Sequence, residues 1–104
     1  MSGPADPHAR VALLLDLGRY AEARTEVEHA LAEAPDDPGL LAAHADALGG
    51  VGDHASALAS AGRAVALAPD DHAAHRRRAL ALTRLGSHTD ATTAAREVVR
   101  LAPE

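Results

Sequence analysis

Histidines and acidic residues are the side chains of this sequence that could hold a metal ion. The chain contains seven histidines, and His72 and His75 are spaced one helical turn apart, so that both rings could reach one zinc ion. A convincing site needs a third or fourth ligand at defined spacing, and the sequence has no cysteine. We therefore expect no metal site and interpret the histidines as surface or packing residues.

Nucleophilic and phosphate-binding chemistry has even less support. Ser2, Ser56, Ser60 and Ser87 lack an evident base and orienting partner in the sequence. The acidic pairs at 36–37 and 70–71 recur at corresponding positions, which favours a role in turns and helix caps. The glycines near residue 50 are not followed by the Lys-Ser/Thr of a phosphate-binding loop. We expect no catalytic residues, no cofactor and no enzymatic activity.

A basic segment stands out on an acidic chain. Residues 72–86 carry Arg76, Arg77, Arg78 and Arg84 without an acid, giving +4 against −9 for the remainder. One interpretation is a solvated helix face that pairs with acids such as Asp46 or Asp37. The other is a basic stripe that binds an acidic partner, because guanidinium groups bind carboxylates through two hydrogen bonds. The net charge of −5 and the lack of aromatic residues disfavour a nucleic-acid partner.

A 34-residue period determines the elements that position these side chains. Prolines 35, 69 and 103 share this spacing, and so do glycines 18, 52 and 86. A period of this length indicates one structural unit repeated along the chain. The sequence therefore predicts one domain over residues 1–104, with repeats at 4–37, 38–71 and 72–104.

Each repeat carries the signals of two helices. Asp6-Pro7 and Asp37-Pro38 are typical of helix starts, and Asp71 can cap the equivalent helix alone. The glycines supply left-handed stops, and each second helix should end at an Ala-Pro pair. Asp53 is a good cap for a second helix, and Ser87 with Asp90 predicts a capping box. No segment alternates with the period of a strand.

These features resemble the tetratricopeptide repeat family over nearly the whole chain. The glycine of that family's turn matches Gly18, Gly52 and Gly86, and its tyrosine matches Tyr20, where the later repeats have His54 and His88. Its later alanines match Ala23, Ala57 and Ala91, and then Ala30 and Ala64, and its proline matches Pro35, Pro69 and Pro103. The common tryptophan is replaced by Pro7, Leu41 and His75. The resemblance implies an all-α right-handed solenoid of six antiparallel helices.

The resemblance also implies a concave groove lined by the first helix of each repeat. Groove positions advance by three or four residues and so share one helix side. We expect Leu15, Leu80, Arg76 and Arg84 to contact a protein or peptide partner, and an acidic partner would suit the arginines. Arg77 is expected at the rim. The full set adds His8, Ala12, Asp16, Ala42, Asp46 and Thr83. The carboxylate clamp of some family members is not reproduced, because the first repeat has His8 and Ala12 at clamp positions.

The rings of Tyr20, His54 and His88 should wedge between the two helices of each unit. The extra glycines, Gly49 and Gly50, should loosen the end of their helix and leave space in the groove. The core should be thin, because 27 of 49 hydrophobic residues are alanine and the chain lacks Trp and Phe.

The last helix has no polar capping helix after it. Val98, Val99 and Leu101 therefore face something that the sequence does not supply. The chain could be an excerpt of a longer protein, could self-associate through this face, or could tolerate a small exposed face interrupted by Arg96 and Arg100.

The function that we expect is a protein–protein interaction scaffold, and the alternative is a structural module that forms homo-oligomers through the last helix. No apolar run approaches a membrane span, and no signal peptide or cysteine is present, so we expect a cytoplasmic protein without a membrane partner. The ten arginines without a lysine suggest a bacterial gene.

Overall fold

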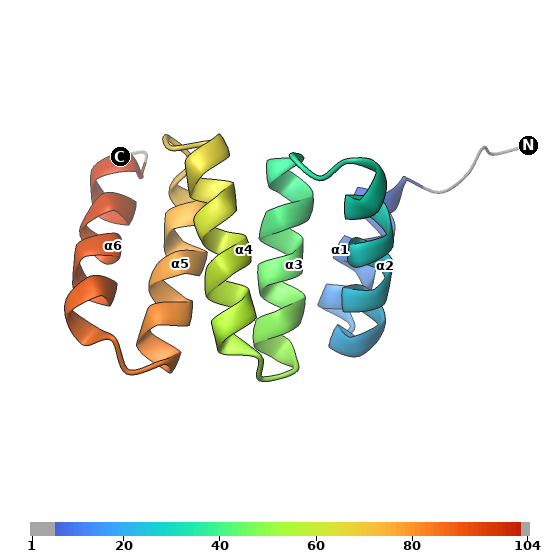
Figure 1. Ribbon diagram of the computed structural model, residues 1–104, viewed down its shortest axis with the longest axis horizontal. Helices are drawn as coiled ribbons and strands as arrows, with labels where there is room; N and C mark the ends of the chain where they lie inside the picture. Colours follow the sequence, from blue (N-terminus) through green and yellow to red (C-terminus); the bar gives the residue numbers. More distant parts are fainter. Residues whose placement is uncertain (1–5, 103–104) are drawn as a thin grey trace, which may run out of the picture.

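The computed structural model describes residues 6–102, which form three consecutive helical hairpins. The helices are α1 (Pro7–Asp16), α2 (Tyr20–Glu33), α3 (Pro38–Gly50), α4 (His54–Leu67), α5 (His72–Arg84) and α6 (His88–Leu101). Figure 1 shows the helices side by side along the longest axis, and the molecule measures 49 × 28 × 23 Å. Within residues 6–102 there is no strand, and the fold is an all-α solenoid as predicted. Pro4, Ala5 and Pro103, which belong to the predicted repeats, lie outside the described residues.

Aspartate caps begin the first helix of each hairpin. Asp6 accepts a hydrogen bond from the His8 amide, Asp37 from the Leu40 amide and Asp71 from the Ala73 amide. These bonds satisfy amides that have no partner within the helix. The predicted starts are therefore confirmed.

The turns inside the hairpins need glycine. Gly18, Gly52 and Gly86 have φ angles of 73°, 87° and 81°, a region that other residues rarely adopt. Asp53 caps α4 through the Ser56 amide, as predicted. The prediction of a capping box at Ser87 is wrong. Ser87 directly precedes α6, but its side chain makes no cap hydrogen bond.

Small side chains bring the helices together. The largest cluster contains Val11, Val27 and Leu40 with alanines 23 and 47, and it joins α1 and α2 to α3. Two smaller clusters, centred on Leu41 and Leu48, join the second hairpin to α5 and are otherwise built mainly from alanine. The core is thin, as the composition predicts, because methyl groups fill much of it.

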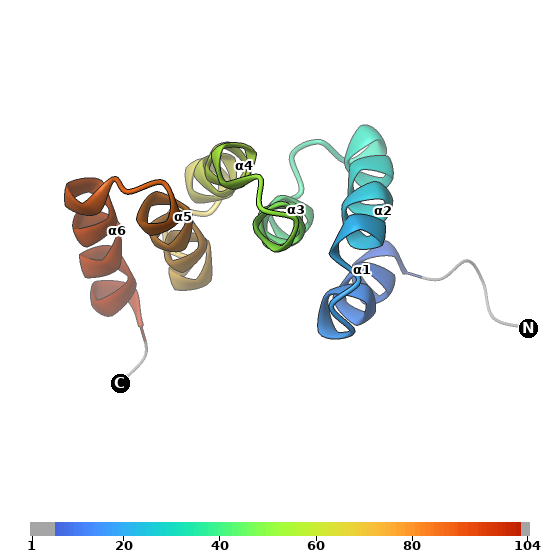
Figure 2. The same cartoon turned by 90° about the horizontal axis from the view of Figure 1, so that it is seen from below.

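The hairpins stack so that their first helices meet. Helix α3 contacts both α1 and α5, although one helix separates each pair in the sequence. Figure 2, seen from below, shows α1 and α3 on the opposite side of the row from α2 and α4. The first helices therefore form a common wall. None of the helices described here combines the length and the hydropathy that a membrane crossing requires.

Candidate functional site

A groove of about 600 Å³ runs across the inner wall from α1 to α5. All three first helices contribute to it, and so do the starts of α2 and α4. Its lining consists of Leu15, Asp16, Tyr20, Ala45, Asp46, Gly49, Gly50, His54, Ala57, Arg77, Leu80, Ala81 and Arg84. The groove is therefore a joint product of three repeats.

The apolar part of the groove is small and open. Leu80 lines it and is 54% exposed, and Leu15 lines it from α1 with a partly buried side chain. Between them α3 presents Ala45 and Gly49, and a Cβ atom added at Gly49 would meet no other atom within 4 Å. A ligand side chain could thus approach the backbone of α3 closely.

Tyr20 forms one wall of the groove by packing against the next repeat. A Cβ atom added at Gly50 would overlap the Tyr20 ring, so the ring occupies the space that this glycine leaves. The prediction that the ring wedges between the helices of its own unit did not include this contact with the next repeat, and His88 is exposed. The predicted loosening is also wrong, since α3 stays helical to Gly50 and the ring fills part of the expected free space.

An ion pair closes the centre of the groove. The Arg77 Nε atom donates to Asp46 Oδ1 at 2.9 Å, and Arg77 Nη1 donates to the Ala73 carbonyl at 3.3 Å. Both partners of the ion pair are partly buried. The interpretation that the basic helix pairs with acids such as Asp46 is confirmed for Arg77. This arginine lies in the groove rather than at its rim, whereas Arg76 is exposed and outside the lining.

Two further charges line the groove at its ends. Asp16 lies in the last turn of α1 and Arg84 in the last turn of α5, and both are exposed. Within residues 6–102 neither side chain takes part in an ion pair or a side-chain hydrogen bond. These two side chains are therefore available to a ligand.

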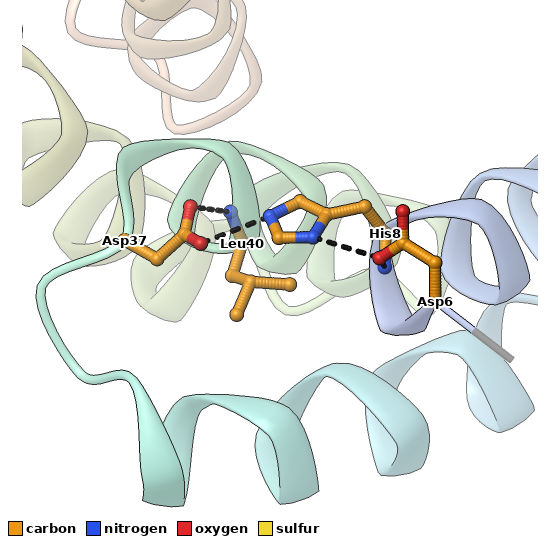
Figure 3. A network of polar contacts seen from close by, with 4 residues as sticks. All are labelled: Asp6, His8, Asp37 and Leu40. Carbon is orange, nitrogen blue, oxygen red and sulfur yellow. Dashed lines mark hydrogen bonds and ion pairs between the residues drawn. The ribbon is translucent and has the colours of Figure 1, made fainter. Parts of the chain in front are cut away.

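The remaining expected groove residues lie outside the lining. Ala42 is buried, Ala12 is exposed, and the Thr83 hydroxyl donates to the Ala79 carbonyl of its own helix. His8 instead links α1 to the start of α3, as Figure 3 shows, with Nε2 at 2.9 Å from Asp37 and Nδ1 at 3.3 Å from Asp6. The hydrogen bond to Asp37 raises the pKa of His8, against a smaller opposing effect of desolvation. His8 thus joins two helix caps.

A chain of hydrogen bonds that runs from buried Ser60 to the surface contradicts the expectation that this serine has no base and orienting partner. The Ser60 hydroxyl lies 2.9 Å from His44 Nδ1, and His44 Nε2 lies 2.9 Å from Glu28 Oε2. A carboxylate only accepts hydrogen bonds, so Nε2 carries a hydrogen, and in the neutral ring Nδ1 then accepts from the hydroxyl.

This order of groups is the one found in serine hydrolases, but the surroundings differ. Ser60 is only 7% exposed and lies in the middle of α4, where backbone amides already donate within the helix and cannot stabilise an oxyanion. We assign these hydrogen bonds between Ser60, His44 and Glu28 a structural role in linking α2, α3 and α4. The 34-residue period could have indicated that His44 and Ser60 are in contact. Arg10 and Glu26 occupy the same two repeat positions in the first hairpin, and their side chains lie 2.8 Å apart.

The two histidines considered as ligands lie in the first turn of α5. His75 is 6% exposed, and its Nε2 atom lies 2.8 Å from the Pro69 carbonyl oxygen. In the part of the chain that the structure describes, no three potential metal-ligating side chains gather. The His75 ring is therefore a packing residue of the turn before α5.

The outer face of α6 exposes apolar surface. Val99 is 78% exposed, while Val98 and Leu101 are partly buried. At the same repeat position, Leu31 and Val65 are partly buried against the clusters that join their hairpin to the next. Val99 thus occupies a position that a following helix covers elsewhere in the molecule.

Comparisons with known proteins agree with this architecture. A family model described as tetratricopeptide repeat matches residues 42–104. No curated protein sequence matches the chain. A MamA structure from Desulfovibrio magneticus RS-1 superposes with a TM-score of 0.86 and 23% identity, covering 91% of this chain and 54% of that one. The chain thus spans about half the length of that MamA chain.

Two shorter domains are similar over most of their own length. The second TPR of Spaghetti (RPAP3), bound to the HSP90 peptide SRMEEVD, has a TM-score of 0.87 at 23% identity over 92% of this chain and 89% of that one. The first TPR of the same protein, bound to the same peptide, has a TM-score of 0.88 at 24% identity over 94% and 78%. The TM-scores establish likeness of fold, and at these identities the likeness extends to the fold alone.

Proposed function

The chain belongs to the tetratricopeptide repeat family, and we propose that it is a protein–protein interaction scaffold that binds a peptide or helical segment of a partner in the groove. The observation that carries this proposal is the open groove to which all three hairpins contribute. Two similar domains were solved with a peptide bound, which supports the same use of the fold here. We further propose that residues 1–104 act as one domain and have no enzymatic activity.

The groove offers few but distinct contacts. Leu15 and Leu80 would bury an apolar side chain of the partner, and Arg84 would bind a carboxylate. Of the two neighbouring arginines only Arg77, not Arg76, lines the groove, and its ion pair with Asp46 shapes the site rather than binding the ligand. A groove this small suits an affinity of about 1 µM, or roughly −8 kcal/mol.

Glycines provide a way to test the site without removing any contact. Gly49 lines the groove, Gly62 does not, and a Cβ atom at either would meet nothing within 4 Å. Both glycines lie in helices, so Gly49→Gln and Gly62→Gln should each favour helix formation by up to about 1 kcal/mol. The Gly49→Gln side chain would project into the groove, whereas that of Gly62→Gln would not.

A partner isolated from the native host by pull-down should then bind the two variants differently. We expect Gly49→Gln to lose the partner and Gly62→Gln to retain it, as measured by calorimetry with the purified partner. Equal binding by both variants would reject the groove as the site. Circular dichroism would verify that both remain helical.

Self-association through α6 is the second candidate function, and the exposure of Val99 favours it. We propose that Val98, Val99 and Leu101 would form the contact between copies. Sedimentation at several concentrations should show a dimer that Val99→Asp dissociates. A monomer at high concentration would exclude this function.

A further inference from the structure

One residue from each first helix forms a row across the groove. Asp16, Gly50 and Arg84 are spaced 34 residues apart and so occupy the same position in α1, α3 and α5. All three line the groove. The row therefore has an acid at one end, a residue without a side chain in the middle and a base at the other end.

The central charges of the groove already neutralise each other. Asp46 and Arg77 form the ion pair at 2.9 Å, and Arg77 has a second acceptor in the Ala73 carbonyl. A ligand that recruited either side chain would have to break this contact. The charges that remain in the lining, Asp16 and Arg84, have no ionic partner among residues 6–102.

The two free charges differ in how well their helices accommodate them. The carboxyl end of a helix carries partial negative charge, which favours a cation and disfavours an anion in the last turn. Arg84 at the end of α5 is therefore well placed, whereas Asp16 at the end of α1 is repelled by its own helix. A cation bound at Asp16 would offset that repulsion, and no ion pair within the described residues does so.

We propose that the groove selects a segment with charges of both signs, with a basic side chain at Asp16 and an acidic side chain at Arg84. This proposal rests on the groove being the binding site. Small or apolar ligand residues would lie between the charges, over Gly49 and beside Leu15 and Leu80. The partner is thus a bipolar peptide rather than the uniformly acidic one that the basic segment suggests.

Geometry sets the spacing of the two ligand charges. Neighbouring packed helices lie about 8–10 Å apart, so the two steps from α1 to α5 span roughly 16–20 Å. An extended peptide advances at most about 3.3–3.6 Å per residue. The basic and acidic residues should therefore be about five or six positions apart.

Synthetic heptapeptides with blocked ends would test the charge requirement by calorimetry. The bipolar probes are Lys-Ala-Ala-Leu-Ala-Ala-Glu and its reversed sequence, because the groove could bind a chain in either direction. The acidic control has Glu at both ends, and the basic control has Lys at both ends. We expect one bipolar peptide to bind more tightly than either control, by roughly 1.5- to 5-fold for each solvent-exposed ion pair.

Two protein variants assign the contacts. Asp16→Asn should weaken the bipolar peptide, and this loss should vanish when the peptide's Lys is replaced by Gln. Arg84→Gln should behave in the same way toward the peptide's Glu. Within residues 6–102 neither side chain makes an ion pair or a side-chain hydrogen bond, so helicity should not change.

The outcomes separate this inference from the function on which it rests. Tight binding of the acidic control, unchanged binding by Asp16→Asn, or no binding of any heptapeptide would overturn the bipolar requirement. In each case the groove would still stand as the site if Gly49→Gln abolishes binding of the purified partner. Retained partner binding by Gly49→Gln would instead reject the groove itself.

Discussion

The two joints between hairpins are built differently. The first joint, where α1 and α2 meet α3, has one continuous cluster that includes Val11, Val27 and Leu40. The second joint, where α3 and α4 meet α5, has two separate clusters, each with one buried leucine and two buried alanines. Because burial free energy scales with apolar area, the first joint should be the stronger one.

Polar contacts increase the difference. Three links cross or flank the first joint, from His8 to Asp37, from His44 to Glu28 and from Arg63 to the turn at Pro35 and Asp36. Within residues 6–102 the one ion pair that crosses the second joint is Arg77–Asp46, and it lies in the groove. The molecule thus combines a well-packed first joint with a second joint that shares residues with the candidate site.

Truncating a leucine in each joint tests this difference most strongly. Leu40 and Leu48 are both buried in α3, facing the first and second joints respectively. Leu40→Ala should lower the free energy of unfolding by about 2–5 kcal/mol, because it leaves a cavity in the larger cluster. Leu48→Ala should cost less, since its cluster has fewer atoms to lose contact with.

Urea denaturation followed by circular dichroism would measure both losses. A Leu48→Ala variant as unstable as Leu40→Ala would show that the joints are equally strong.

His75 lies in the first turn of α5, beside Ala74 of the second joint. His75 Nδ1 is buried without a hydrogen-bond partner in the described structure, and the equivalent residue of the second hairpin is the buried Leu41. An unsatisfied buried polar atom costs about 1–3 kcal/mol. His75→Leu loses the bond to the exposed Pro69 carbonyl, which water can replace, so we expect a net gain of about 1 kcal/mol.

Thermal unfolding of His75→Leu beside His72→Leu would test this expectation. The control changes a histidine in the same helical turn without removing the buried nitrogen. A melting temperature of His75→Leu at or below that of the parent would contradict the prediction.

The smallest expected effect is the pH dependence of the first joint. Because the pKa of His8 is raised in the folded state, its contribution is complete below about pH 6.5 and disappears as the pH rises through the folded value. Desolvation alone would raise the pKa of Asp37, but the hydrogen bonds from Leu40 and His8 outweigh it and lower the pKa. The contribution of Asp37 is therefore present above about pH 4 and lost in more acidic solution.

The stability difference between the parent chain and His8→Ala should consequently be larger at pH 5.5 than at pH 8.5. Urea denaturation at the two pH values measures it. An equal difference at both would show that the link to Asp37 does not depend on protonation of His8.

The residues that begin and end helices made the fold predictable. Prediction of the site was limited because the direction in which each side chain points was not known. Asp-Pro pairs and left-handed glycines act through local backbone geometry, so the helix bounds follow from the sequence alone. One residue step turns a helix by about 100°, and this rotation decides that Arg77, not Arg76, lines the groove.

Contacts between hairpins were harder to foresee. The Tyr20 ring could have packed within its own unit, and only the absence of a side chain at Gly50 permits its position against α3. The hydrogen bonds from Ser60 to His44 and from His44 to Glu28 join three helices, and each bond links residues 16 positions apart in the sequence. Such contacts depend on how far adjacent hairpins rotate, which no local signal specifies.

The contact between Tyr20 and Gly50 constrains which repeat can follow the first one. Removing the middle 34 residues would place Arg84 after the first unit at the position of Gly50, and its Cβ atom would collide with the aromatic ring. The modules therefore cannot be shuffled freely, although they share one period. Evolutionary loss of the middle module would therefore require a change at Tyr20 or at the residue that takes the place of Gly50.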